Sequence, residues 1–391
     1  MRADLPEASP AALAASAELS QRIAAEIAAR GGWISFARYM ELALYAPGLG
    51  YYTGGAHKFG DALSGGDFVT APELTPLFGQ ALARQVAQVL AASQPFVIEA
   101  GAGSGQLAAD LLLALEAQDC VPQRYAILEL SGELRARQAA TLARRAPHLL
   151  DRVDWLDDLS EKFSGCLIGN EVLDAMPTHA VRWGNESMFE IGVMVDAPGR
   201  LILSERPASG ALLETAQALP VESPYRGEIS LAARAWVAEL ARRLEHGAML
   251  LIDYGLPRRE LYHPQRDGGT VRCHYRHRVH DDPLWLPGLS DITSHVDFTA
   301  VAEAGFDAGL SVLGYTSQAQ FLINCGIGEL LLARKVGAGE TASLQDLKAQ
   351  GAVSVLLSPN EMGELFKVTA LGRGLPAPLL GFARGDRTHA L

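Results

Sequence analysis

Apolar residues recur along this chain with two different spacings. Alanine, leucine and isoleucine follow a helical spacing over residues 11–30, and a pair of glycines ends the pattern, which predicts a helix. The same spacing predicts a short helix at 34–40 and a longer one at 76–92, which opens on a proline suited to a first helical turn. The N-terminal part of the chain is therefore expected to be mainly helical.

Short apolar runs replace this spacing in the middle of the chain. Such runs are typical of strands buried in a parallel sheet. We expect strands at 96–100, 125–129, 153–156, 165–170 and 247–254, with helices at 107–115 and 131–145. Because strands that alternate with helices form parallel sheets with right-handed crossovers, the pattern predicts an α/β fold with a Rossmann-like sheet and helices on both of its faces.

Two further stretches interrupt this alternation. Residues 187–195 and 200–203 have the pattern of antiparallel strands in an inserted α+β cap, and a second insertion at about 256–295 is rich in histidine, arginine, proline and glycine. Towards the C-terminus we expect a strand at 310–315, one helix at 317–333 and a strand at 365–369.

The composition narrows the classes of protein that fit. Apolar residues make up 49% of the 391 residues and charged residues 20%, which suits a large folded core. The net charge of −12 argues against a nucleic-acid partner, because such proteins neutralise phosphates with a basic surface. An acidic surface attracts a cationic protein partner, or it serves solubility alone.

The spacing of the cysteines and the N-terminal sequence indicate the cellular compartment that we expect for the protein. The four cysteines lie far apart without a C-x-x-C pair, so we expect neither a disulfide framework nor a metal site. The N-terminus lacks the apolar stretch of a signal peptide, and no apolar run has the length needed to span a bilayer. These features favour a cytoplasmic protein without membrane insertion.

A glycine-rich turn follows the first predicted strand and opens a helix, with the sequence Glu99-Ala100-Gly101-Ala102-Gly103-Ser104-Gly105. Strand, turn and helix in this order form the start of a nucleotide-binding unit. The dinucleotide fingerprint would need a glycine where Gln106 stands, and the lysine of a P-loop is absent. An acid followed by G-x-G-x-G is instead typical of class I methyltransferases, whose cofactor is S-adenosylmethionine.

The carboxylates and glycines of this region have expected roles in binding that cofactor. Glu99 at the strand end can bind the amino group of the methionine part, while Gly101, Gly103 and Gly105 leave room for the carboxypropyl chain and the ribose. Glu129 ends the next strand, where a carboxylate can accept both ribose hydroxyls, and an ordinary solvated acid is the alternative.

Polar residues also follow the third and fourth strands. Leu156 and Asp157 lie where class I enzymes contact adenine, and a charged loop is the equally open alternative. Asn170, Glu171 and Asp174 should face the methyl group and its acceptor, because open α/β sheets bind ligands outside the carboxyl ends of their strands. A helix-capping box is the alternative explanation for these polar residues.

Segments longer than the glycine motif indicate a particular protein family. The chain resembles the MidA-like family of protein methyltransferases over nearly its whole length, in segments 39–45, 50–52, 66–73, 99–105, 170–177, 252–255, 269–272, 291–298 and 381–387. The Gly-Asp-Phe-Val-Thr and Asp-Ile-Thr-x-His-Val-Asp-Phe segments are the most distinctive of these. Mitochondrial members of this family methylate an arginine of a respiratory complex I subunit.

The resemblance implies further site residues and a class of substrate. It implies that Asp67, Phe68 and Thr70 belong to a segment that folds over the cofactor, and that Asn170 and Glu171 flank it. It also implies a protein substrate, with an arginine guanidinium as the expected acceptor.

Three residues are the candidates for catalysis. Because carboxylates can orient a guanidinium and take its proton, Glu171 and Asp174 are the first two. His295, which has Asp291 and Asp297 nearby in sequence, is a weaker candidate base, and a structural histidine is the alternative. The basic run at 272–280 is either a flap or clamp for a protein partner or a solvated strand.

These expectations combine into one scheme. We expect an N-terminal helical extension that closes over the cofactor at 1–94, the first half of the core at 95–177, the inserted cap at 178–245, and the second half of the core at 246–391 with the substrate-side insertion at 256–295. The expected function is S-adenosylmethionine-dependent methylation of a protein. A non-catalytic cofactor-binding assembly factor and a small-molecule methyltransferase are the alternatives, and a homodimer is left open.

Overall fold

The computed structural model describes residues 5–54, 70–337, 343–376 and 378–391. The chain divides into two compact units, each assembled from three separate stretches. We call Val69–Val172, Trp236–Gly255 and Phe298–Leu391 the core unit, and Met1–Phe68, Leu173–Ala235 and Leu256–Asp297 the accessory unit. The boundary between Val172 and Leu173 falls inside the polar segment that was expected to carry the chemistry.

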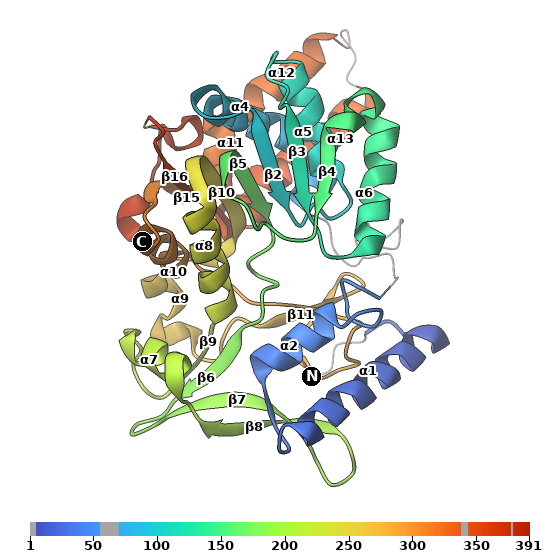
Figure 1. The fold of residues 1–391 in the computed structure, drawn as a ribbon, viewed down its shortest axis with the longest axis vertical. Coiled ribbons are helices and arrows are strands. Elements are labelled where there is room, and N and C mark those ends of the chain that lie inside the picture. The colour runs from blue at the N-terminus through green and yellow to red at the C-terminus, as the bar shows by residue number, and fades with distance from the viewer. Residues whose placement is uncertain (1–4, 55–69, 338–342, 377) are drawn as a thin grey trace. The chain divides into compact units, whose positions relative to one another are not determined.

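The central sheet of the core unit runs in the order β15–β16–β10–β5–β2–β3–β4 (Figure 1). Strands β10, β5, β2, β3 and β4 are parallel, and β16 is antiparallel to both of its neighbours. Their bounds are β2 (Phe96–Ala100), β3 (Arg124–Leu128), β4 (Val153–Leu156), β5 (Phe163–Asn170), β10 (Leu244–Leu256), β15 (Ser311–Ser317) and β16 (Phe366–Arg373). The predicted α/β sheet is confirmed, and each of these strands overlaps a run expected from the sequence.

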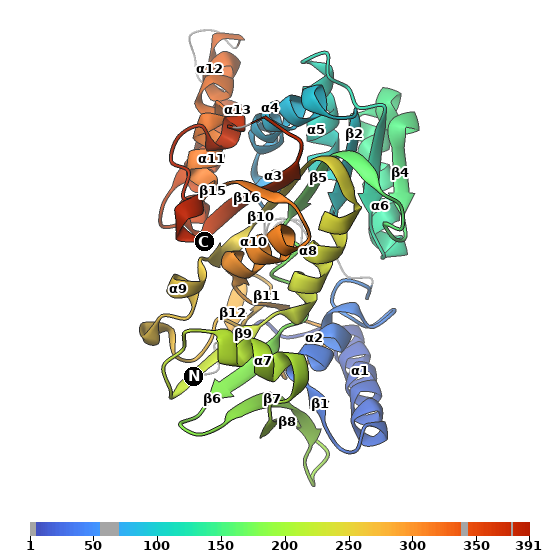
Figure 2. The ribbon, with the colours of Figure 1, turned by 60° about the vertical axis from the view of Figure 1, so that its left-hand side comes forward.

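Helices flank this sheet on both faces (Figures 1 and 2). Apolar residues of α4 (Pro76–Ala92), α5 (Gln106–Glu116) and α6 (Gly132–Arg145) share one buried cluster with alternate residues of the strands. On the opposite face, Gly305 of α10 (Phe298–Asp307) packs against Leu371, and Trp236 of α8 (Leu231–Arg243) lies near Gly169. The prediction of helices on both faces is therefore confirmed.

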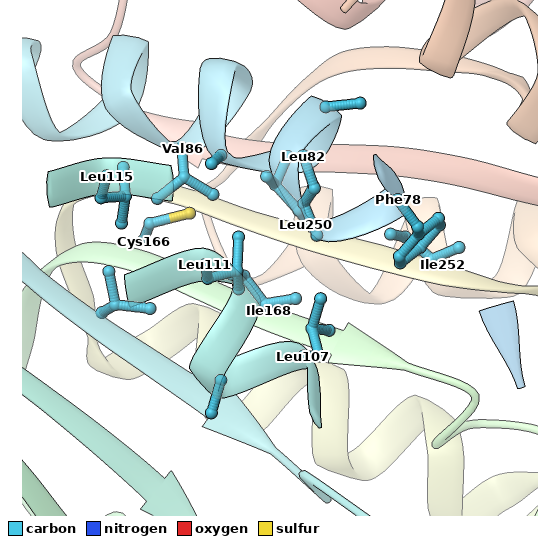
Figure 3. Close-up of a cluster of buried hydrophobic side chains, with 14 of the residues drawn as sticks. Phe78, Leu82, Val86, Leu107, Leu111, Leu115, Cys166, Ile168, Leu250 and Ile252 are labelled. Atoms are coloured by element: carbon cyan, nitrogen blue, oxygen red, sulfur yellow. The ribbon is translucent and has the colours of Figure 1, made fainter. Parts of the chain in front are cut away.

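The buried cluster beneath α4 and α5 is the main hydrophobic core of the core unit. Figure 3 shows side chains of both helices pointing towards the strands, with Ile168 of β5 and Leu250 of β10 beneath them. Phe78 of α4 is 1% exposed, and Leu111 of α5 and Ile168 are fully buried. Because interiors of this kind are close-packed, the layer restricts how far each strand can shift along its neighbours.

The expected single helix at 317–333 is two helices in the structure. Helix α11 (Gln318–Asn324) ends before Cys325, and α12 (Ile327–Gly337) begins after Gly326. The backbone of Gly326 has a φ of +76°, a conformation that ends a helix and that glycine adopts readily. The prediction of one helix was wrong because a helical apolar spacing continues across this left-handed residue.

The accessory unit contains an antiparallel sheet in the order β1–β7–β6–β9, with β8 paired to β7. The cap strands expected at 187–195 and 200–203 are confirmed, whereas β6 and β9 were not predicted. The bounds are β1 (Ile34–Ser35), β6 (His179–Trp183), β7 (Met188–Val195), β8 (Leu201–Pro207) and β9 (Tyr225–Ile229).

The N-terminal helices of the accessory unit follow the sequence with one correction. Helix α1 (Pro10–Ala29) matches its prediction, but the helix expected at 34–40 is α2 (Phe36–Tyr45), which starts later and runs further. The reason is a cap: the Ser35 hydroxyl accepts a hydrogen bond from the backbone N–H of Arg38 at 3.1 Å. Residues 34 and 35 are instead paired with β7.

The basic run at 272–280 forms a hairpin in the accessory unit. Strands β11 (Arg272–Tyr275) and β12 (Arg278–His280) are joined by Arg276 and His277, both of which have positive φ, and β13 (Asp291–Thr293) pairs with β11.

The remaining elements are short or lie near the C-terminus: α3 (Ala71–Leu74), α7 (Gly210–Ala218), α9 (Arg258–Leu261), β14 (Val296–Asp297), α13 (Leu344–Leu357), α14 (Met362–Leu365) and the 3₁₀ turns η1 (Pro147–Arg152), η2 (Pro264–Arg266), η3 (Leu380–Phe382) and η4 (Thr388–Ala390).

Neither a membrane-spanning helix nor a metal-binding cluster is found among the described residues. Within those ranges, no helix has the length and hydropathy that crossing a bilayer requires. Over the same part of the chain, no group of three or more histidine, cysteine or acidic side chains is arranged to hold a metal ion.

Truncating the buried layer under α4 and α5 should destabilise the protein strongly. Replacing Ile168 by alanine removes fully buried methyl groups and leaves a cavity, so Ile168→Ala should lower the free energy of unfolding by about 2–5 kcal/mol in urea titrations. Leu332→Ala on α12 is the matched control, because that side chain is 62% exposed and its loss should cost no more than about 0.5 kcal/mol. Equal losses in the two variants would contradict the described packing.

Candidate functional site

The glycine turn connects the end of β2 to the start of α5, as the sequence predicted. Gly101 has a φ of +65°, and a Cβ atom there would lie 3.3 Å from a methyl carbon of Val172. A β-branched residue at Gly101 would therefore be strained by its backbone and crowded by its neighbour. Gly103 and Gly105 also have positive φ, at +51° and +81°.

Glu99 is buried on the strand that leads into this turn. Its side chain is 2% exposed, and Oε2 accepts a hydrogen bond from the Tyr125 hydroxyl at 2.6 Å. Burial raises the pKa of Glu99 to about 7, although the hydrogen bond from Tyr125 opposes the shift, and the nearby charge of Glu129 adds to it. Tyr125 was not predicted as a site residue, although its hydroxyl group within an otherwise apolar strand was an available signal.

A second carboxylate reaches the glycine turn from α3. The hydroxyl of Ser104 donates a short hydrogen bond to Glu73 Oε1. Glu73 lies in a segment that carried the family resemblance, but it was not predicted as a site residue. Thr70 precedes α3 and makes no side-chain capping bond, while Asp67 and Phe68 lie outside the described residues.

Glu129 directly follows β3, as expected for a ribose-binding carboxylate, and is 8% exposed. Oε1 accepts from the backbone N–H of Ser131 at 2.9 Å, and Oε2 accepts from Gln138 Nε2 at 3.1 Å. Burial raises the pKa of Glu129, and these two hydrogen bonds oppose the shift. Because each carboxylate oxygen has two lone pairs, both oxygens can accept one further donor, as a vicinal diol would supply.

Arg135 contacts the backbone at the ends of both β3 and β4, beside Glu129. Its guanidinium donates to the carbonyl oxygen of Leu156 at 2.8 Å and pairs with Asp157 at 2.7 Å. The Asp157 side chain is 91% exposed. Leu130, which follows Glu129, is 81% exposed and presents an apolar surface at this edge of the sheet that the sequence analysis did not single out.

The segment after β5 has a strained backbone. Glu171 has a φ of +54°, which is unfavourable for a residue other than glycine, asparagine or aspartate. The neighbouring strand β10 holds this conformation, because Glu171 N–H donates to Ile252 O at 2.8 Å and Val172 N–H donates to Asp253 Oδ2 at 3.1 Å. Asp253 is fully buried and was not predicted as a site residue, although it too lies in a segment of the family resemblance.

Asn170 holds the carboxylate of Glu171. Its Nδ2 group donates to Glu171 Oε1 at 3.0 Å. Its own Oδ1 atom is buried and accepts no hydrogen bond from the described protein. Since buried acceptors are usually satisfied, this atom is suited to receive a donor from a ligand.

The other two catalytic candidates belong to the accessory unit. Asp174 is 5% exposed, and its carbonyl oxygen accepts from Ser294 N–H at 3.0 Å. The backbone N–H of His295 donates to the Thr270 hydroxyl at 3.0 Å. The structure thus brings Asp174 beside the segment that contains His295, whereas Glu171 belongs to the core unit.

The core unit has the chemistry to hold a nucleoside that also carries a cationic amine. Glu129 can accept from a diol, the buried Glu99 can pair with an ammonium group, and Asn170 offers an acceptor that has no donor among the described residues. The glycine turn contains no lysine or arginine that would neutralise a phosphate. S-adenosylmethionine has the diol and the amine and lacks the phosphate, so the residues present fit it.

The strand order, with β16 antiparallel beside β10, and the acid-G-x-G-x-G turn define a class I methyltransferase fold. A family model described as "Putative S-adenosyl-L-methionine-dependent methyltransferase" matches residues 81–316. This match covers more than half of the chain, so the protein belongs to that family. It is a methyltransferase, and its cofactor is S-adenosylmethionine, as the sequence analysis predicted.

Individual relatives extend the similarity over nearly the whole chain. A Burkholderia thailandensis protein with S-adenosylhomocysteine bound in its crystal structure is 51% identical, with a TM-score of 0.94 over 99% of this chain and 100% of that one. The mouse protein arginine methyltransferase NDUFAF7, mitochondrial, is 31% identical over 87% of this chain and 81% of its own length. The zebrafish protein of the same name is 29% identical over 89% of this chain and 85% of its own length.

The raised pKa of Glu99 should make stability depend on pH. Between its ordinary pKa of 4.5 and the folded value of about 7, the unfolded state releases the Glu99 proton and the folded state keeps it. The folded state then binds more protons, so the Glu99 contribution to the unfolding free energy falls as pH rises through this window and levels off above it.

Glu99→Gln isolates this contribution, because glutamine does not titrate and can still accept from Tyr125. The unfolding free energy of wild type minus that of Glu99→Gln should fall from pH 4.5 to 7 in urea titrations. A difference that stays constant over this range would show that Glu99 has an ordinary pKa.

The left-handed backbone of Glu171 predicts an unusual order of stability. Glycine avoids the strain that a Cβ atom brings, so Glu171→Gly should be more stable than Glu171→Ala by about 1 kcal/mol in urea titrations. The control is Lys348, an exposed residue inside helix α13, where glycine should be less stable than alanine by about 1 kcal/mol. The same order at both positions would argue against a strained Glu171.

Proposed function

We propose that this methyltransferase modifies an arginine side chain of a protein. The observation that carries the proposal is the similarity to relatives named protein arginine methyltransferases, which extends over most of both chains. The acidic character of the candidate residues agrees with it, because a guanidinium is cationic and pairs well with carboxylates.

In this proposal the core unit binds the cofactor through residues at the strand ends. Glu99 accepts from the ammonium of its methionine part, and Glu129 accepts from the two ribose hydroxyls. Gly101, Gly103 and Gly105 would let the backbone approach closely, and Leu156, Asp157 and the exposed side chain of Leu130 are the proposed contacts of the base. When bound, S-adenosylmethionine supplies a methyl group that is already activated for transfer.

The protein then has to align the acceptor nitrogen and receive its proton. A protonated guanidinium is a poor nucleophile, and its pKa lies above about 12. We assign the Glu171 carboxylate, held by Asn170, to orient the guanidinium and concentrate its charge away from the attacking nitrogen. Holding the reacting atoms in line contributes about 7–11 kcal/mol towards lowering the barrier.

The new nitrogen–carbon bond would form as the sulfur–methyl bond of the cofactor breaks, with S-adenosylhomocysteine as the leaving group, and the guanidinium proton then needs an acceptor. One N–H bond of the guanidinium breaks, and its proton passes to a carboxylate and from there to water. Glu171 and Asp174 are the proposed acceptors. His295 is the weaker candidate, and its backbone contact with Thr270 is what a structural histidine would also make.

The cellular location and the oligomeric state of the protein are predictions. The sequence favours a cytoplasmic protein, whereas the named relatives are mitochondrial. We also propose a homodimer. Size-exclusion chromatography with light scattering would test it by measuring the molar mass of the full chain in solution.

Cofactor binding and methyl transfer should be separable by mutation. Gly101→Val adds a β-branched side chain at a positive φ and next to Val172, so it should abolish S-adenosylmethionine binding in calorimetry. Gly328→Val is the control, because a Cβ atom at that glycine meets nothing within 4 Å, and it should bind the cofactor like the wild type. Glu171→Ala should still bind S-adenosylmethionine, but it should transfer methyl groups at least about a hundredfold more slowly than the wild type.

The substrate class is tested by mass spectrometry after incubation of cell proteins with the enzyme and isotopically labelled S-adenosylmethionine. Labelled methylarginine that is lost with Glu171→Ala is the expected result. Label on another residue type would contradict the arginine proposal. Label only on metabolites would favour a small-molecule methyltransferase, and no turnover with intact binding would favour an assembly factor.

A further inference from the structure

Gln138 makes contacts that join three separate parts of the core unit. It lies on α6 and is fully buried. Its Nε2 group donates to the carbonyl oxygen of Gly103 at 3.2 Å and to Glu129 Oε2 at 3.1 Å. Its Oε1 atom accepts from the indole N–H of Trp155 at 2.9 Å. One side chain therefore connects the glycine turn, the carboxylate after β3 and the strand β4.

Trp155 determines which way the amide of Gln138 faces. An indole N–H can donate but cannot accept, so it must meet the oxygen end of the amide. The NH₂ end is thereby turned towards two acceptors, Gly103 O and Glu129 Oε2. A flipped amide would leave those acceptors without a donor and would place its NH₂ group against the indole N–H, and both changes are unfavourable in a buried site.

The same contacts fix the carboxylate of Glu129. One oxygen is held by the backbone N–H of Ser131 and the other by Gln138, so the plane of the group cannot rotate without losing a hydrogen bond. The glycine turn is held at the same place, because a Cβ atom at Gly105 would lie only 2.9 Å from the Cα atom of Gln138. The position of Glu129 relative to the turn therefore depends on Gln138.

We propose that Gln138 is a positioning residue, which sets the Glu129 carboxylate for recognition of the cofactor ribose, and that Trp155 acts through it. The inference rests on the proposed ribose role of Glu129 and adds the residues that make the role possible. It predicts a larger loss in the ribose-dependent part of binding than in the methionine part, which is assigned to Glu99 and to the glycine turn that Gln138 contacts only at Gly103 O.

Gln138→Met tests the inference, because methionine is close to glutamine in length and makes none of the three hydrogen bonds. Calorimetry would compare S-adenosylhomocysteine with its 2′,3′-dideoxy analogue. Losing a hydrogen bond to a charged group should weaken binding of the parent ligand about ten- to a hundredfold. Binding of the dideoxy analogue should weaken by a clearly smaller factor, because it loses only what the bond to Gly103 O contributes. Equal weakening of both ligands would indicate a merely structural role and would overturn the proposal.

Glu129→Ala separates this inference from the function on which it rests. It should bind the two ligands with similar affinity. If Glu129→Ala still prefers the ligand that has both hydroxyls, the ribose role of Glu129 is wrong. If it loses that preference and Gln138→Met retains it, only the role of Gln138 is wrong.

Trp155→Phe gives an independent measurement and remains informative if Gln138→Met does not fold. Phenylalanine keeps the aromatic ring and removes the indole N–H, so it should weaken the preference for the ribose hydroxyls by a smaller factor than Gln138→Met does. In the Gln138→Met background it should have no further effect. A Trp155→Phe protein with the full wild-type preference, or losses that multiply in the double variant, would contradict action through Gln138.

Discussion

The apolar layer between the parallel strands and helices α4 and α5 is the constraint on which the site depends. Close packing of Leu111 and Ile168 leaves the strands no room to shift along one another. Glu99, Glu129 and Asn170 lie at or directly after the carboxyl ends of three neighbouring strands. Their separations are therefore set by strand register, and the loops add only the orientation of each side chain.

Buried carboxylates beside this layer need donors to be tolerated. An ionised carboxylate without hydrogen bonds is costly in an apolar surrounding. Tyr125 donates to Glu99, while Ser131 and Gln138 donate to Glu129, yet burial still keeps the pKa of both acids raised. A cationic ligand group next to Glu99 would favour its ionised form, so binding a cation relieves part of this cost. The electrostatics of the core unit thus favour a cofactor with positive charge.

The sequence predicted the parts of this site that local patterns determine. The positions of the glycine turn and of Glu129 in the fold were predicted correctly, because strand ends, turn glycines and the residues after them follow one another along the chain. Gln138 and Asp253 were missed, because their roles arise from contacts between a helix or strand and a loop that is distant in sequence. Apolar spacing could place α6 and β10 but could not show which polar side chain of each reaches the site.

The break at Gly326 and the antiparallel strands β6 and β9 were missed for related reasons. A helical spacing of apolar residues continues through a left-handed glycine, so periodicity alone does not mark the break. Short antiparallel strands gain their stability from partners elsewhere in the chain, and β6 pairs with β7 and β9 across loops of different lengths.

Glu171 shows how the backbone and the chemistry of the site are coupled. A glycine would avoid a left-handed strain of roughly 1–2 kcal/mol, but it would remove the carboxylate. The hydrogen bonds from Glu171 and Val172 to β10 hold the strained turn, and Asn170 then fixes the direction of the carboxylate. In the proposed reaction a positioned carboxylate contributes a factor of about a hundred or more in rate, roughly 3 kcal/mol, which exceeds what the strain costs the fold. Asp253 is buried in the interior and accepts a hydrogen bond from the backbone N–H of Val172. By holding this backbone, it supports the proposed role of Glu171.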